Sequence, residues 1–336
     1  MTTPTPAPSV PGPRAARRGG LTVAIDIGGT KIAGALVHDD GTMSVRARRD
    51  TPRGVSGDEV MAAVEEVVAE LAAAPAWSEV TRCGVGSAGP VDAVTGTVSP
   101  VNITAWRQYP VRARTEAALT RHGADVPVVL VGDGVAMTAA EHRHGAARGH
   151  ANALCMVVST GVGGGLVLGD RLLPGPTGNA GHIGHISVDV AGPICGCGGH
   201  GCVEAIASGT AIARWAAEQG WTPAAGDRAD AAAVARAADA GDPVALAAFD
   251  RAGRALAAAI AATATLVETD IAVIGGGVAS AGETLFGPIR RHLADFATLG
   301  FVSGLAVVPA ALGTDAGLIG AAAAAGDLIP TAPAGR

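Results

Sequence analysis

Short apolar runs that end in glycine-rich turns recur along the chain and predict a series of β-strands. Residues 21–41 place two apolar strands around Gly28-Gly29, and residues 153–173 repeat this plan. The segment after Gly28-Gly29 is a strand and not a helix, so the glycines form a hairpin and not a dinucleotide-binding loop. Further apolar strands are expected at the start of 126–147, where a turn and a helix follow, and in 270–280, which ends in a glycine turn.

Helical periodicity alternates with these strands. Apolar residues three and four positions apart predict a helix over 57–73. Alanine-rich stretches predict two helices within 229–264 and a closing helix within 312–326. Alternating strands and helices indicate an α/β protein.

The repeated strand–turn–strand plan predicts two related lobes with a ligand cleft between them. We expect the lobes to meet near Asp133. The expected organisation is a disordered Pro-rich tail (1–20), an N-terminal lobe (21–132) completed by a helix at 314–327, and a C-terminal lobe (133–313) that carries a metal-binding loop (185–202).

Composition narrows the class of protein. Hydrophobic residues make up 49% and charged residues 16%, which predicts a large core and argues against global disorder. The net charge of −6 offers no basic surface for nucleic acid or an anionic membrane. The apolar runs are too short to cross a bilayer. The cysteines are odd in number, five, and three of them are tightly clustered, which favours a reducing cytoplasm over a disulfide framework.

Three glycine turns are candidate phosphate sites. The first, Asp26–Lys31, combines a carboxylate for hydrated Mg²⁺, open backbone amides at Gly28, Gly29 and Thr30, and the chain's single lysine. The second includes Thr160 and Gly161, and the third is Gly275, Gly276 and Gly277. Three such turns after apolar strands favour a nucleotide, although each turn alone is also typical of an ordinary hairpin or loop.

Asp133 is a candidate catalytic base. It lies between Gly132 and Gly134, where a strand meets a helix, and we expect the helix N-terminus to keep its carboxylate ionised. Such a carboxylate is suited to positioning a hydroxyl for phosphoryl transfer. The alternative is a plain helix N-cap.

A cysteine cluster predicts structural zinc. Cys195, Cys197 and Cys202 supply three soft ligands, and His185 is the preferred fourth, with His182 and His200 as rivals. The alternative, three free thiols, would be prone to oxidation. A metal in this loop would hold Glu204 and His182 in place.

These motifs resemble those of the ROK family of sugar kinases and repressors. The stretches that carry the resemblance span residues 21–326: "DIGGTK", "VGDG", "STGVGGG", "GHIGH…GPICGCGGHGCVEAIASG", "VIGGGV" and "GTDAGLIGAA". The resemblance implies an actin-like, ribonuclease-H-like ATPase fold with ATP and a sugar between two lobes. It also implies Asp133 as base, the three turns as ATP sites, sugar contacts from Asn102, Asp133, His182, His185 and Glu204, and zinc on His185, Cys195, Cys197 and Cys202.

Two departures bear on the substrate. Most ROK hexokinases have Glu where this chain has His182, whereas bacterial N-acetylmannosamine kinases share its "AGHIGH". The family's usual Asn before the base is replaced by Gly132, which removes a polar contact worth about 1 kcal/mol or more. The resemblance thus favours a cytoplasmic, dimeric, Mg²⁺- and ATP-dependent N-acetylmannosamine 6-kinase.

Three other functions stay open. The nearest is the same chemistry on glucose. A sugar-responsive transcription regulator would need a DNA-binding domain, and only the Pro-rich tail precedes the "DIGGT" strand. A sugar sensor without catalysis is the third, motivated by Gly132.

Overall fold

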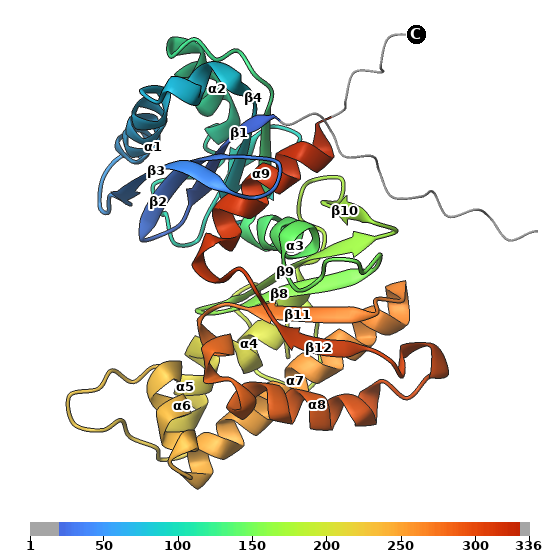
Figure 1. The fold of residues 1–336 in the computed structure, drawn as a ribbon. Coiled ribbons are helices and arrows are strands. Elements are labelled where there is room, and N and C mark those ends of the chain that lie inside the picture. Colours follow the sequence, from blue (N-terminus) through green and yellow to red (C-terminus); the bar gives the residue numbers. More distant parts are fainter. Residues whose placement is uncertain (1–19, 330–336) are drawn as a thin grey trace, which may run out of the picture.

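The computed structural model describes residues 20–329 and is built around two five-stranded sheets (Figure 1). The predicted tail at 1–20 therefore lies, except for Gly20, outside the described residues. The first sheet has the order β3-β2-β1-β4-β7 and the second β10-β9-β8-β11-β12. The strands of the first sheet are β1 (Leu21–Ile27), β2 (Lys31–Val37), β3 (Met43–Asp50), β4 (Val80–Ser87) and β7 (Val128–Gly132). Those of the second are β8 (Ala153–Val158), β9 (Val162–Leu168), β10 (Arg171–Leu173), β11 (Ile271–Gly275) and β12 (Ala306–Pro309).

The two sheets have the same connectivity. In each, three antiparallel strands come first in the chain, β1–β2–β3 and β8–β9–β10, and two parallel strands follow, β4 and β7 or β11 and β12. Both strand–turn–strand patterns read from the sequence are confirmed as hairpins, with Ile27 opposite Ile32 and Val158 opposite Val162. A short ribbon of β5 (Val91–Asp92) and β6 (Thr97–Val98) lies apart from both sheets.

Two helices occupy the space between the sheets (Figure 1). Helix α3 (Asp133–His144) packs on β8 and β9, and α9 (Ala316–Leu328) packs on β1 and β4, with the two helices in extensive mutual contact. Glycine permits this closeness: a Cβ atom at Gly320 would lie 1.9 Å from the carbonyl oxygen of Ala136. The backbones of α3 and α9 therefore meet directly, and α3 begins with Asp133 at the end of β7.

The remaining helices cover the outer faces of the sheets. On the first sheet these are α1 (Gly57–Ala72) and α2 (Val111–Arg121). On the second they are α4 (Val203–Ala207), α5 (Gly209–Glu218), α6 (Ala231–Asp239), α7 (Pro243–Val267) and α8 (Glu283–Phe296). The helices predicted from periodicity are confirmed, and the one long alanine-rich run became α7, which begins after the Asp242 cap.

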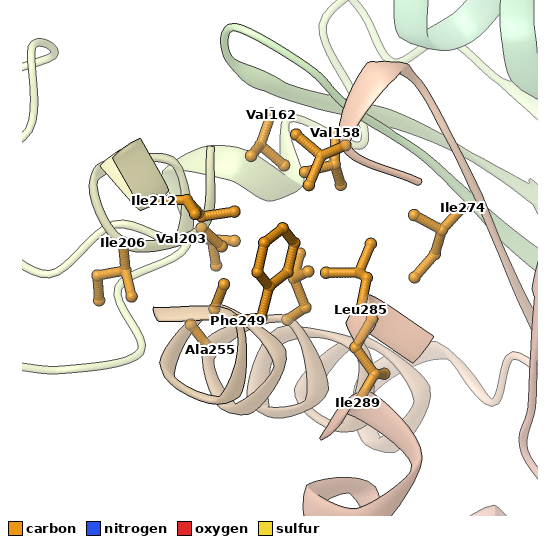
Figure 2. Close-up of a cluster of buried hydrophobic side chains, with 14 of the residues drawn as sticks. Val158, Val162, Val203, Ile206, Ile212, Phe249, Ala255, Ile274, Leu285 and Ile289 are labelled. Atoms are coloured by element: carbon orange, nitrogen blue, oxygen red, sulfur yellow. The ribbon is translucent and has the colours of Figure 1, made fainter. Parts of the chain in front are cut away.

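Alanine and branched aliphatic residues build most of the core. Phe249 lies at the centre of the cluster under the second sheet, among side chains from α4, α5, α7, α8 and the strands (Figure 2). Small alanine side chains let α7 and α8 approach closely, so dense packing is reached with only 3% aromatic residues. Among residues 20–329, no helix is both long and apolar enough to span a bilayer.

Candidate active site and metal centre

The first glycine turn presents free amides beside a polar side chain. The Gly28 amide donates to the Lys31 carbonyl at 2.9 Å and closes the turn, while the amides of Gly29 and Thr30 donate to no protein acceptor within residues 20–329. A Cβ at Gly29 would lie 2.7 Å from Nδ2 of Asn102. Asn102, expected on the sugar side, thus lies directly against the turn expected to bind phosphate.

Asp26 and Asp133 lie near each other beside the first glycine turn. Asp26 is at the end of β1, and its carboxylate lies against the first turn of α9, where a Cβ at Gly317 would come within 2.5 Å of Oδ2. Burial raises the pKa of Asp26, Lys31 lowers it, and the nearby Asp133 charge raises it further. Two carboxylates close enough to influence each other, next to free amides, form a site that favours a cation together with phosphate.

Asp133 corrects one expectation. The helix N-terminus does act on it, since the Gly134 amide donates to Oδ1 at 2.7 Å and lowers its pKa, and His182 lowers it as well. Burial outweighs both, so the pKa of Asp133 is raised above the ordinary aspartate value. The residue is nevertheless exposed to solvent, so protein atoms crowd around the carboxylate without covering it. Gly132, and not Asp133, is the N-cap of α3, so a plain capping role is wrong.

The second glycine turn lies on the other side of Asp133. A Cβ at Gly163 would be 3.8 Å from Asp133 Oδ1, which places the start of β9 beside the carboxylate. The amides of Thr160 and Gly161 donate to no acceptor in the described part of the chain. Glu204, in the first turn of α4, accepts a hydrogen bond from the Val162 amide at 2.9 Å.

The third turn adjoins the second. Gly276 has φ of 92°, and a Cβ there would lie 2.4 Å from the Val158 carbonyl oxygen, so only glycine fits. A Cβ at Gly277 would be 3.8 Å from Ser159 Oγ. Gly275 ends the buried strand β11, next to β8. The structure therefore brings the second and third turns together at the same edge of the second sheet.

The cysteine cluster has the geometry of a closed tetrahedral metal site. One donor atom from each of His185, Cys195, Cys197 and Cys202 lies within 4.8 Å of the others. The Cys197 and Cys202 sulfurs are 3.7 Å apart, and Cys195 Sγ is 3.8 Å from His185 Nδ1. Bonds of about 2.3 Å at tetrahedral angles require sulfur separations of about 3.8 Å, so this donor set fits zinc. Neither rival, His182 or His200, belongs to the cluster.

His182 connects the metal loop to Asp133. Its ring stacks against that of His185 with centroids 6.0 Å apart, and Nδ1 lies 3.1 Å from the Asn179 carbonyl oxygen. His182 follows Gly181, where a Cβ would lie 2.5 Å from Gly165 Cα on β9, the strand whose start lies beside Asp133. The metal loop thus extends to the edge of the region around Asp133.

Two residues were missed by sequence reasoning. Gly317 lets the N-terminus of α9 approach Asp26, and buried Glu141 accepts hydrogen bonds from the backbone that leads to α9. Gly317 belongs to the stretch "GTDAGLIGAA", whose pattern does not reveal that Asp26 is its partner. Glu141 carries no motif; only its position three turns into a buried helix could have drawn attention to it.

Known proteins resemble nearly the whole chain. The ROK family signature matches residues 22–327. The glucokinase of Thermotoga maritima is 36% identical over 312 residues, which cover 89% of this chain and 95% of the relative. The N-acetylmannosamine kinase of Yersinia pseudotuberculosis is 36% identical over 303 residues, covering 90% and 97%.

A solved structure gives the same picture. The ROK family glucokinase of Streptomyces griseus, determined in complex with glucose and AMPPNP, superimposes with a TM-score of 0.74 at 34% identity, covering 91% of this chain and 99% of that one. The expected actin-like ATPase fold is therefore confirmed.

Proposed function

Because the chain belongs to the ROK family of sugar kinases, we propose that it transfers the γ-phosphoryl group of ATP to the 6-hydroxyl of N-acetyl-D-mannosamine. One observation carries the kinase assignment. The solvent-exposed Asp133 carboxylate lies between two hairpin turns whose amides at Gly29, Thr30, Thr160 and Gly161 have no protein acceptor in the described region. Such amides stabilise charge on transferring phosphoryl oxygens without reorganisation.

In the proposed reaction Asp133 orients the sugar hydroxyl towards the γ-phosphorus and accepts its proton as the oxygen–phosphorus bond forms and ADP leaves. A raised pKa brings this carboxylate closer to the operating pH and makes it a better proton acceptor than an ordinary aspartate. The free amides and Lys31 hold phosphate oxygens. Asp26 would hold hydrated Mg²⁺, which neutralises phosphate charge when bound.

The other site residues have supporting roles in the proposal. Asn102, His182, His185 and Glu204 would contact the sugar, and Gly275–Gly277 would lie near the adenosine. Zinc on His185, Cys195, Cys197 and Cys202 would be structural, since four protein ligands leave no position for water. We further propose lobes at 21–132 with 314–327 and at 133–313, and a homodimer. We also propose a cytoplasmic enzyme, because none of the five cysteines forms a disulfide within residues 20–329.

The choice of sugar depends on His182 and Gly132. Relatives with 36% identity act on either sugar by name, so overall similarity does not separate them. At Gly132 φ is −69° and a Cβ would meet no atom within 4 Å, so neither strain nor packing requires glycine there. The open space beside Asp133 suits an acceptor larger than a plain hexose.

A sugar panel tests the proposal. With ATP and Mg²⁺ in a coupled ADP-release assay, we expect kcat/KM for N-acetylmannosamine to exceed that for glucose by about tenfold or more. Gly132→Asn should shift this ratio towards glucose by adding an amide that binds hydroxyls, and Gly132→Ala, which adds no donor, should not. A wild-type preference for glucose would reassign the enzyme as a glucokinase. Sugar binding without ADP release would leave only a sensor.

A further inference from the structure

Glu204 makes two kinds of contact from one carboxylate. Oε2 accepts the Val162 amide at 2.9 Å, and it would lie 2.6 Å from a Cβ at Gly161, so it is packed directly on the second glycine turn. No hydrogen bond to Oε1 occurs among residues 20–329. One oxygen is thus committed to the turn, while the other stays available to a ligand.

Glu204 is also fixed from the other side by the cysteine cluster. Cys202 is the N-cap of α4, and Glu204 lies in the first turn of that helix. The Val203 amide donates to the Ile186 carbonyl at 3.0 Å, beside His185. The backbone that carries the cysteine cluster therefore fixes the position of Glu204 at the start of α4.

The segment that follows α4 holds the same turn by its carbonyl groups. The Gly209 amide donates to the Ser159 carbonyl at 2.7 Å, and Thr210 Oγ1 donates to the Thr160 carbonyl at 3.1 Å. Carbonyls of the turn are thus bound from one side, and its Thr160 and Gly161 amides are left facing elsewhere. This arrangement keeps the free amides pointing in a constant direction.

We propose that Glu204 is a positioning residue for the nucleotide: it links the metal loop to the phosphate-binding turn, so that this loop sets affinity for ATP as well as for the sugar. The inference rests on the proposed function, which assigns Glu204 to the sugar alone. Loss of the acceptor leaves the Val162 amide unpaired and the turn free to tilt. Preorganised amides bind phosphate better than mobile ones.

The test measures Mg·ATP binding by calorimetry in the absence of sugar. Glu204→Ala should weaken binding by about tenfold, the effect of losing one hydrogen bond to a charged group. Glu204→Gln keeps an acceptor for the Val162 amide and should stay within about threefold of wild type. Glu218→Ala, on the exposed face of α5, is the matched control and should bind like wild type.

A second arm removes the metal. Cys197→Ser, whose side chain is exposed, should bind Mg·ATP more weakly than wild type once zinc analysis shows the metal lost and circular dichroism shows the fold retained. If Cys197→Ser does not fold, Glu204→Ala and Glu204→Gln decide alone.

The outcomes separate this inference from the proposed function. Unchanged Mg·ATP affinity in Glu204→Ala, with a raised KM for sugar, would limit Glu204 to sugar contact and overturn the inference. Wild-type protein that binds Mg·ATP but phosphorylates no sugar would remove the function only. Wild-type protein that binds no Mg·ATP would remove both.

Discussion

Asp133 shows how one side chain can be acted on by opposing effects. Its neighbours Gly132 and Gly134 leave room around it, and the Gly134 amide and His182 both favour the charged form. Burial at the meeting point of β7, α3 and the second hairpin favours the neutral form and prevails. The charged form of Asp133 is therefore less favoured than that of an aspartate in water, and such perturbed groups are often found at functional sites.

Asp133→Asn should lower kcat by a factor of about 100 to 10,000, because the amide cannot accept the proton. It should also raise the melting temperature at pH 7. The pKa of Asp133 is higher in the folded state than in the unfolded chain. At a pH below the unfolded-state pKa the residue is protonated in both states and costs no stability. As the pH rises from that pKa through the raised folded-state pKa, the wild-type protein loses stability. Melting curves of both proteins from pH 3 to 7 check this; a lower melting temperature for Asp133→Asn at pH 7 would contradict it.

The loop from Ile183 to Cys202 shows how an element can be ordered without regular secondary structure. It contains one 3-10 turn, Ile183–His185, and two isolated bridges, Ser187 with Cys202 and Ile194 with His200. Turn hydrogen bonds, such as the one from the Cys195 amide to the Gly199 carbonyl at 2.7 Å, hold the rest. A metal on the four converging donor atoms would add to this order, because it would tie both ends of the loop together.

Cys197→Ser should reduce zinc content and lower the melting temperature, and it should do so through the metal alone, since this cysteine is exposed and its loss removes little packing. His200→Ala is the matched control: it lies in the same loop, outside the cluster, and should keep one zinc per chain and wild-type stability. Atomic emission and thermal melting measure both. Equal zinc loss in the two variants would show that His200 is a zinc ligand and that the assignment of His185 is wrong.

The whole molecule is held together by α3 and α9 between the two sheets (Figure 1). Glu141, fully buried near the end of α3, accepts hydrogen bonds from the backbone amides of Ala146, Ala311 and Leu312 at 2.8 to 3.1 Å. The last two precede α9, whose first turn contacts Asp26. Asp315, in the same connection, is paired in a bidentate manner with Arg46 on β3. These contacts fix α9 relative to both sheets.

Glu141→Ala should lower the free energy of unfolding by about 2 to 4 kcal/mol, because three backbone amides lose their acceptor inside the protein. Urea denaturation monitored by circular dichroism gives the value. Glu141→Gln, which keeps one acceptor oxygen, should fall in between, and the exposed Glu218→Ala should change stability by less than about 0.5 kcal/mol. If Glu141→Ala lost no more free energy of unfolding than Glu218→Ala, Glu141 would not be the residue that fixes α9.

Interactions between near neighbours in the chain could be predicted from the sequence. The hairpins around Gly28-Gly29 and Ser159–Gly161, the amphipathic helix α1 and the three clustered cysteines depend on residues a few positions apart, so their patterns are visible in the sequence itself. Long alanine-rich runs likewise marked α7 and α9. The family motifs extended this reading to the fold.

Tertiary structure decided whatever depends on distant segments. It selected His185 over His182 and His200, because a metal site needs convergence in space and not proximity in sequence. It raised the pKa of Asp133 through burial, placed Asn102 on Gly29, and joined Glu204 to Val162. Each of these outcomes follows from how the two sheets and the helices between them pack, and periodicity along the chain carries no information about that packing.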